Sequence, residues 1–128
     1  MLLNLTDLSD ESLQSQIMRQ IRARILAGDL PADTNLPSIR AFAREHHVSV
    51  ITVQRAYEGL IRDGLIRSRR GKGFFVSELP KDQKKDMAKE RLHSQLEPIV
   101  RAALAEGLSG ADIRAAIKLI LNHDKEKK

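Results

Sequence analysis

Two short helical patterns followed directly by two β-favouring runs occupy residues 38–77, and this order constrains the fold more than any other feature of the sequence. The first pattern covers residues 38–46 and places its apolar side chains on one face. The second begins after Ser49, whose hydroxyl can cap a helix by accepting a hydrogen bond from the amide of Ile51 or Thr52. Its buried face is predicted from residues at helical spacing, namely Val53, Ala56, Tyr57 and Leu60.

A β-hairpin is predicted next, after the helix-ending pair Asp63-Gly64. Leu65–Arg69 and Phe74–Ser77 favour strands, and they flank the glycine-containing loop Arg70–Gly73. An amphipathic helix, predicted over residues 11–27, precedes the whole arrangement. Three helices and a hairpin in this order, with a tight turn between the second and third helices, describe a winged helix-turn-helix.

The ends of the first helix are marked by polar residues and a glycine. Ser9 or Asp10 can accept hydrogen bonds from its first N–H groups, and Gly28 suits the left-handed turn that ends a helix. Residues 29–35 combine a proline with short polar side chains, which predicts a turn.

Residues 80–128 form a second predicted region. Pro80 and the charge run over residues 81–86 mark a boundary, so we expect one domain over residues 1–79 and a helical region over residues 80–128. Two amphipathic helices are predicted there, the second opened by a capping box from Ser109 to Asp112. The predicted fold class is therefore α+β, mostly α, with a two-helix C-terminal tail.

Two local features of this tail carry their own predictions. Pro98 lacks an N–H inside a helical pattern, which predicts a kink or a break near Glu97. Residues 124–128 are predicted to fray as a charged chain end.

Positive charge is concentrated in the predicted winged helix-turn-helix. The whole chain has a formal net charge of +5, and Leu36–Val76 contains eight Lys and Arg residues against three Asp and Glu residues. This segment alone therefore accounts for the net charge. A basic excess on a helix-turn-helix and its hairpin points to nucleic acid as the partner.

The outward face of the third helix is predicted to carry the base contacts. Gln54 can pair with adenine, and Arg55 can reach guanine or a phosphate. Ser49 and Thr52 lie near the amino end, where free N–H groups suit a phosphate. Two interpretations of the apolar pair Val50-Ile51 carry equal weight, because these side chains can contact thymine methyl groups or pack on the preceding helix.

The tip of the hairpin combines cations with glycine. Arg69, Arg70 and Lys72 lie beside Gly71, which lets the backbone approach another surface closely. We expect this wing to lie along the phosphates or in the minor groove of a DNA duplex. The alternative is a solvated hairpin turn without a partner.

An ordered set of motifs runs through the same region: Leu36-Pro-Ser-Ile-Arg40, Val48-Ser49, Thr52-Val53, Asp63-Gly-Leu-Ile66 and Arg70-Gly-Lys-Gly-Phe-Phe-Val76. With these motifs, residues 11–77 resemble the DNA-binding domain of the GntR family of bacterial transcription regulators. The resemblance implies operator contacts from Arg40, Ser49, Val50, Thr52, Gln54, Arg70 and Gly71. Many family members carry arginine and threonine near Val50 and Ile51, and arginine in place of Gln54, so the resemblance implies the docking mode rather than the base preference.

The short helical tail is similar to that of the YtrA subfamily, in which it serves for dimerisation. Two short amphipathic helices cannot enclose a sizeable ligand pocket, so we expect no dedicated small-molecule effector domain. A second copy would cover their apolar faces and create the two-fold symmetry that reads a palindromic operator. The residues expected at this interface are Leu92, Leu96, Ile99, Val100, Leu104, Ile113, Ile117 and Ile120. The alternative is that the tail folds back on its own domain.

Other classes of protein fit the sequence less well. The chain has no Cys, no P-loop and no nucleophile motif, and its four His residues show no ligand spacing, so we expect no enzyme activity, metal or cofactor. No membrane span or secretory signal is visible, so we expect a cytoplasmic protein. Two alternatives to a transcriptional repressor remain: a winged helix that binds another protein, and a DNA-binding factor for plasmid partition or replication.

Overall fold

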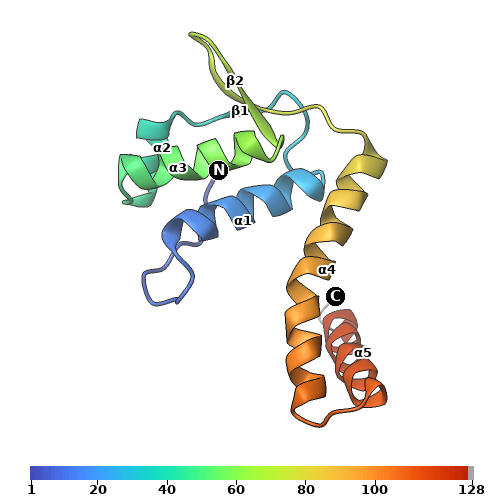
Figure 1. Ribbon diagram of the computed structural model, residues 1–128. Coiled ribbons are helices and arrows are strands. Elements are labelled where there is room, and N and C mark those ends of the chain that lie inside the picture. The colour runs from blue at the N-terminus through green and yellow to red at the C-terminus, as the bar shows by residue number, and fades with distance from the viewer. Residues whose placement is uncertain (127–128) are drawn as a thin grey trace. The chain divides into compact units, whose positions relative to one another are not determined.

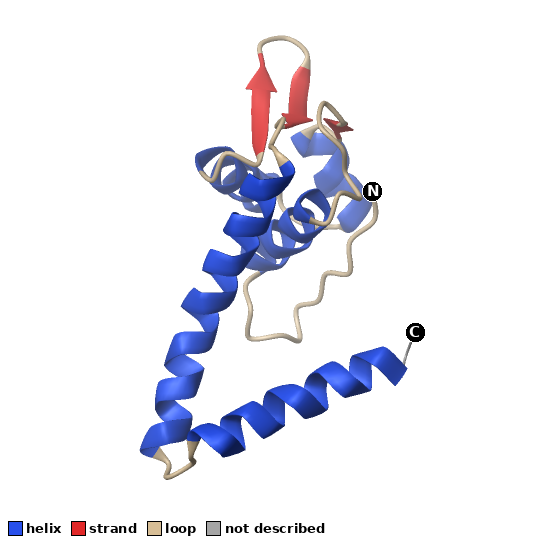
Figure 2. Ribbon diagram, turned by 90° about the vertical axis from the view of Figure 1, so that its right-hand side faces the viewer, coloured by secondary structure: helices blue, strands red, loops and turns tan. Residues whose placement is uncertain are grey.

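The computed structural model describes residues 1–126 of the chain (Figures 1 and 2). The chain divides into two units, the first covering Met1–Lys85 and the second starting at Asp86. The elements follow in the order α1 (Leu13–Leu26), β1 (Asn35–Leu36), α2 (Ile39–His46), α3 (Val50–Arg62), β2 (Ile66–Arg69), β3 (Gly73–Val76), α4 (Lys81–Ala105) and α5 (Gly110–Glu126). The predicted fold class, a winged helix-turn-helix followed by two helices, is confirmed. The boundary between the two units falls inside α4 rather than at Pro80, because the charge run is part of this helix and not a linker.

The first unit contains a three-stranded antiparallel sheet in the order β1-β3-β2. The predicted hairpin is present, but Gly73 pairs with Arg69 and belongs to β3, so the connecting loop has one residue fewer than predicted. Strand β1 was not predicted, because residues 29–35 show only turn chemistry. Its two residues join the sheet by pairing Asn35 with Phe75 and Leu36 with Phe74.

The core of this unit lies where α3 packs against α1 and α2. The predicted stripe of α3 is fully buried. Tyr57 sits at its centre, with its ring edge-on to Phe42 of α2 and Phe74 of β3. Its hydroxyl donates a 2.8 Å hydrogen bond to the Pro37 carbonyl, and burial raises the pKa of Tyr57. This one side chain therefore connects the helix-turn-helix to the wing.

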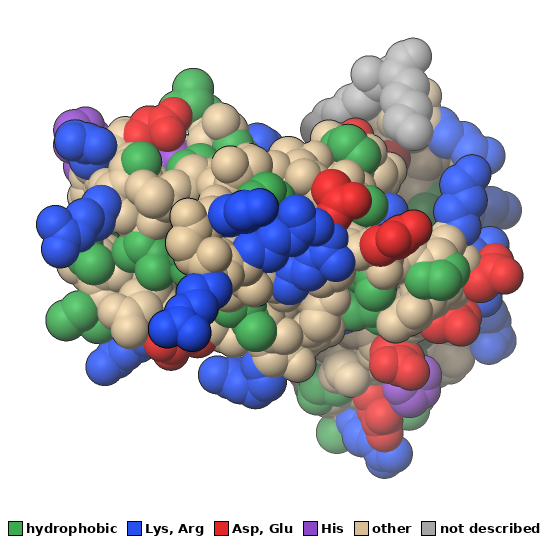
Figure 3. Space-filling model, turned by 90° about the horizontal axis from the view of Figure 1, so that it is seen from above, with side chains coloured by type: hydrophobic (Ala, Val, Ile, Leu, Met, Phe, Trp, Pro, Cys, Tyr) green, Lys and Arg blue, Asp and Glu red, His purple; other side chains and the backbone are tan. Residues whose placement is uncertain are grey.

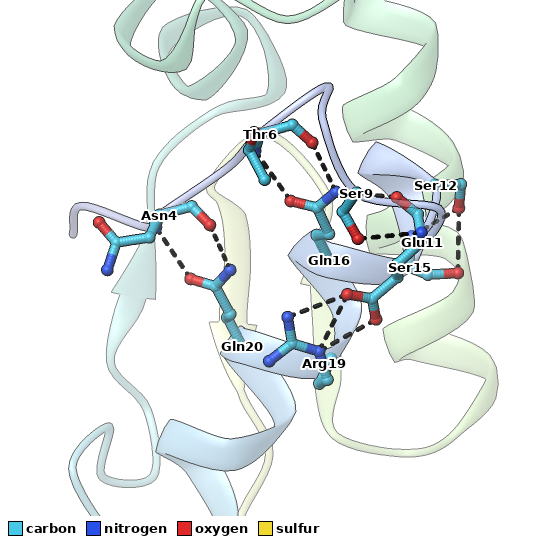
Figure 4. A network of polar contacts seen from close by, with 9 residues as sticks. All are labelled: Asn4, Thr6, Ser9, Glu11, Ser12, Ser15, Gln16, Arg19 and Gln20. Carbon is cyan, nitrogen blue, oxygen red and sulfur yellow. Dashed lines mark hydrogen bonds and ion pairs between the residues drawn. The ribbon is translucent and has the colours of Figure 1, made fainter.

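The segment before α1 is fastened by two glutamine side chains (Figure 4). The amide of Gln16 both accepts from the Thr6 N–H and donates to the Thr6 carbonyl, and the amide of Gln20 bonds to Asn4 in the same paired way. Helix α1 is capped by Ser12, so the predicted cap at Ser9 or Asp10 is wrong. Those two residues lie in a loop, since Gln16 also donates to the Glu11 carbonyl and holds the chain outside the helix at that point.

The sequence predicts a kink or a break near Glu97; helix α4 runs unbroken through Pro98, so the break is wrong and the kink stays a prediction. Proline removes only the hydrogen bond to the Ser94 carbonyl, and both residues are exposed, so water can satisfy that carbonyl. The predicted capping box at the start of α5 is present, and both of its hydrogen bonds are formed. The Ser109 hydroxyl accepts from the Asp112 N–H, and the Asp112 carboxylate accepts from the Ser109 N–H, which lowers the pKa of Asp112.

The end of α5 extends further than expected. Residues 124–126 are helical rather than frayed. Lys127 and Lys128, the rest of the predicted charged end, lie outside the described residues.

Candidate nucleic-acid interface

The turn between α2 and α3 consists of three residues and sets the amino end of α3. Helix α2 begins at the Ser38 cap and ends at His47, which adopts the left-handed conformation with φ 55°. Ser49 then caps α3, and its hydroxyl accepts a 3.1 Å hydrogen bond from the Thr52 N–H, one of the two partners predicted from the sequence. A tight connection of this kind leaves the first turn of α3 at the surface.

The first turn of α3 contains hydrogen-bond donors that the described residues leave unpaired. The N–H groups of Thr52 and Val53 bond to Ser49, whereas those of Val50 and Ile51 have no partner among the described residues. The Ser49 hydroxyl donates to the Thr52 hydroxyl at 2.7 Å, so the Thr52 hydroxyl keeps its own hydrogen for an outside acceptor. No acidic residue lies in this turn. Free N–H groups at the positive end of a helix dipole are suited to a phosphate.

The outward face of α3 combines apolar and polar side chains. Val50 and Ile51 are 45% and 61% exposed, so neither is buried against α2, and packing on α2 was one of the two interpretations of this pair. Gln54 donates a 3.2 Å hydrogen bond to the Glu58 carboxylate, a contact that was not predicted. Arg55 is exposed, and no hydrogen bond or ion pair to another described residue engages its side chain.

One acid that sequence reasoning missed forms ion pairs with the wing. Asp33, in the loop before β1, forms ion pairs with Arg67 and Arg69 of β2. Arg69 also lies over the ring of Phe75, 4.6 Å from its centroid. The predicted cationic tip is thus partly neutralised at its base, by a residue that no local pattern connects to the hairpin.

The outer part of the wing stays open. Arg70 and Lys72 are exposed and have no ion pair with any described residue. Gly71 has φ 74°, and nothing lies within 4 Å of where its side chain would be, so it shapes the turn and leaves room for another surface. Arg40, in the first turn of α2, is likewise exposed and unpaired among residues 1–126.

Seen from the side of the hairpin tip, Lys and Arg side chains gather over the first unit, with hydrophobic side chains among them (Figure 3). Within residues 1–126, no three His, Asp or Glu side chains come together as metal ligands would. None of the helices in that part of the chain is long and apolar enough to cross a membrane.

The second unit leaves its apolar side chains open. Helices α4 and α5 diverge from their connecting loop and do not pack along their lengths (Figure 2). Neither helix contains a fully buried residue among those described. Of the predicted interface residues, Leu96, Val100 and Ile113 are half-buried, and the exposed ones are Leu92, Ile99, Leu104, Ile117 and Ile120.

Comparison with known proteins identifies the family. The model of the bacterial regulatory proteins of the gntR family matches residues 13–76, from α1 to the last strand of the wing. The chain belongs to the GntR family. The uncharacterized HTH-type transcriptional regulator YhcF of Bacillus subtilis is 32% identical over 111 residues, which cover 86% of this chain and 90% of YhcF.

Two further GntR proteins resemble the chain beyond the wing. The HTH-type transcriptional repressor YtrA of Bacillus subtilis is 34% identical over 88 residues, covering 66% of this chain and 68% of YtrA. A solved GntR family transcriptional regulator from Listeria monocytogenes has a TM-score of 0.75 at 25% identity and covers 89% of this chain and 97% of its own. The predicted resemblance to GntR proteins of the YtrA type is confirmed. The chain spans only 15% and 33% of the lengths of two longer curated relatives. The family is one of bacterial regulatory proteins.

Proposed function

We propose that the protein is a cytoplasmic, homodimeric repressor that binds a palindromic double-stranded DNA operator and blocks the polymerase at a promoter. The observation that carries this proposal is the open amino end of α3 together with free cations on α2, α3 and the wing. These cations are Arg40, Arg55, Arg70 and Lys72, which are exposed and have no ion pair with any described residue. The similarity to YhcF, a transcriptional regulator, and to YtrA, a transcriptional repressor, supports this role.

Phosphates and bases are contacted by different groups in this proposal. The free N–H groups of Val50 and Ile51 and the Thr52 hydroxyl face the backbone of the duplex, while Arg40, Arg70 and Lys72 neutralise phosphates. Gln54 reads adenine. Its bond to Glu58 uses one of the two amide hydrogens, so the other hydrogen and the amide oxygen remain for the adenine N7 and N6 groups.

The exposed apolar side chains of the second unit support the dimer in this proposal. Its two helices expose leucine and isoleucine side chains that neither helix covers for the other. Contiguous exposed apolar surface of this kind marks an interaction site, and an isologous dimer is the commonest solution. Two copies joined here would present two wings and two copies of α3 to one duplex.

Selection of bound duplexes from a random library tests the DNA part of the proposal. We expect a palindrome whose half-sites lie about 34 Å apart, or a multiple of this distance. Arg70→Ala should weaken binding to the selected duplex and lower the slope of log affinity against log salt by about 0.9 per lost phosphate contact. Arg114→Ala, which removes an exposed arginine of α5, is the matched control and should leave that slope unchanged. If no sequence is enriched, the proposal is contradicted. If genomic copies of the selected sequence occur only at replication origins, the plasmid or replication alternative is favoured.

Sedimentation of the full chain tests the dimer. We expect a dimer at micromolar concentration, converted to a monomer by Ile99→Asp, because the new carboxylate would be buried in an apolar contact. Ser94→Asp introduces the same group at an exposed polar position on the opposite side of α4 and should leave the dimer intact. A wild-type protein that sediments as a monomer would refute this part of the proposal.

A further inference from the structure

The pair Val50-Ile51 is the most exposed apolar feature in the described part of the helix-turn-helix. Both side chains are exposed at the amino end of α3, and Ile51 has the larger exposed fraction, 61%. In the described part of α2 and α3, the only other exposed large hydrophobic residue is Ile61, near the far end of α3. Burial therefore does not explain why these two positions are apolar.

Local structure does not explain the pair either. Valine and isoleucine lose side-chain freedom in a helix and are weaker helix formers than alanine, leucine or lysine. The cap of α3 comes from Ser49 and Thr52, and the Val50 and Ile51 side chains take no part in it. Two β-branched side chains thus stand at the amino end of α3, the end of a recognition helix whose side chains contact base edges in the major groove.

The major groove offers one apolar group, the methyl carbon at position 5 of a pyrimidine. Thymine carries this methyl, and 5-methylcytosine carries it at the same place. Ile51 precedes Gln54 by three residues, so the two side chains are neighbours on one face of α3, with Cβ atoms about 5–6 Å apart. An adenine–thymine pair presents both the groups that glutamine binds and a methyl on the same groove edge.

We infer that Ile51, with Val50 beside it, reads the 5-methyl group of a pyrimidine in each operator half-site, at or next to the base pair read by Gln54. This inference rests on the proposed function, because it assumes that α3 enters the major groove. It adds a specificity-determining contact that operates without any hydrogen bond. A buried methyl contributes ~0.8 kcal/mol, which is about four-fold in affinity per contact.

The test uses duplexes selected by the wild-type protein, with single thymines of one half-site replaced by uracil. Uracil keeps every hydrogen-bonding group of thymine and lacks only the methyl. We expect one or two positions at which this replacement weakens binding about four-fold. Gln54→Ala should relax the base preference at the base pair that Gln54 reads, and the positions sensitive to uracil should lie within a base pair or two of it. At those positions, the protein should bind a duplex that contains 5-methylcytosine more tightly than the same duplex with cytosine, because the contact is made to the methyl group and not to the rest of the base.

Protein variants assign the contact to Ile51. Ile51→Ala should bind thymine and uracil duplexes equally, whereas Ile61→Ala, the same change at the exposed isoleucine near the other end of α3, should keep the discrimination. Circular dichroism of both variants checks that the fold is intact. Wild-type protein that binds the selected duplex specifically but never distinguishes uracil from thymine would overturn the inference alone. Discrimination that persists in both Ile51→Ala and Val50→Ala would also overturn it. Absence of any sequence-specific binding would overturn the proposed function and the inference with it.

Discussion

Asp33 provides the sharpest test of how the wing is charged. Its carboxylate pairs with Arg67 and Arg69, and all three side chains are about half exposed. A phosphate that approaches Arg69 must therefore compete with a carboxylate already present. Asp33→Asn removes this competition while keeping the size of the side chain. Asparagine also tolerates the left-handed backbone found here, with φ 66°.

The size of the effect follows from the exposure of the pair. Exposed ion pairs contribute ~0.2–1 kcal/mol each, so releasing Arg69 should raise operator affinity by about 1.4- to 5-fold per half-site. The slope of log affinity against log salt should steepen by about 0.9 for each freed arginine that reaches a phosphate. The free energy of unfolding should change by no more than about 1 kcal/mol.

Binding isotherms of the selected duplex over a range of salt concentrations measure both quantities. Asp29→Asn is the matched control, because it removes the same charge from an exposed position of the same loop without breaking a described ion pair. If Asp33→Asn binds no more tightly than Asp29→Asn, the reasoning is refuted. In that case Asp33 orients the two arginines for DNA rather than competing with it.

Three further predictions concern stability. Tyr57→Phe should lower the free energy of unfolding by about 0.5–1.5 kcal/mol in urea titrations, because the bond to Pro37 is lost. Burial raises the pKa of Tyr57 above its ordinary value of 10.0, so above this pH the unfolded chain loses the phenol proton while the folded chain keeps it. The free energy of unfolding of the wild-type protein should therefore fall as the pH rises above 10.0, and it should fall more than that of Tyr57→Phe. Gln16→Ala should cost about 1–3 kcal/mol and speed amide exchange at Thr6, with a smaller effect for the more exposed Gln20→Ala. The pKa of Asp112 is lowered in the folded chain from its ordinary value of 3.8, because its ionised carboxylate accepts from Ser109. The hydrogen bonds of the α5 cap should therefore be fully formed above pH 3.8 and should be lost as the pH falls through the lowered pKa. The amide chemical shift of Ser109, followed over pH, measures this loss.

The parts of the fold that local interactions determine could be predicted from the sequence. Caps at Ser49 and Ser109 are bonds between residues three apart, so the spacing of polar side chains reveals them. The buried stripe through Tyr57 follows from helical period alone. The same local reasoning failed at α1, where Ser9, Asp10 and Ser12 are all good caps and a long-range glutamine contact decides among them.

Strand β1 and the proline in α4 show two other limits. Two residues are too few to display an alternating pattern, and Asn35 and Leu36 become a strand only because β3 offers its free edge. Pro98 is a helix breaker by its chemistry, but on an exposed helix it removes one hydrogen bond that water replaces. In both cases the outcome depends on what surrounds the residue, which the local sequence does not contain.

The charge of the interface illustrates the same limit with a consequence for function. Counting charges from Leu36 to Val76 omits Asp33, although this acid faces two of the eight cations in that segment. Among the described residues, the cations of this segment without an ion pair are Arg70 and Lys72 of the wing and those of α2 and α3, while Arg67 and Arg69 tie strand β2 to the loop before β1. The wing is therefore held in place by its inner arginines, and the positive charge available to a duplex lies at its outer end, next to the glycine that lets the backbone come close.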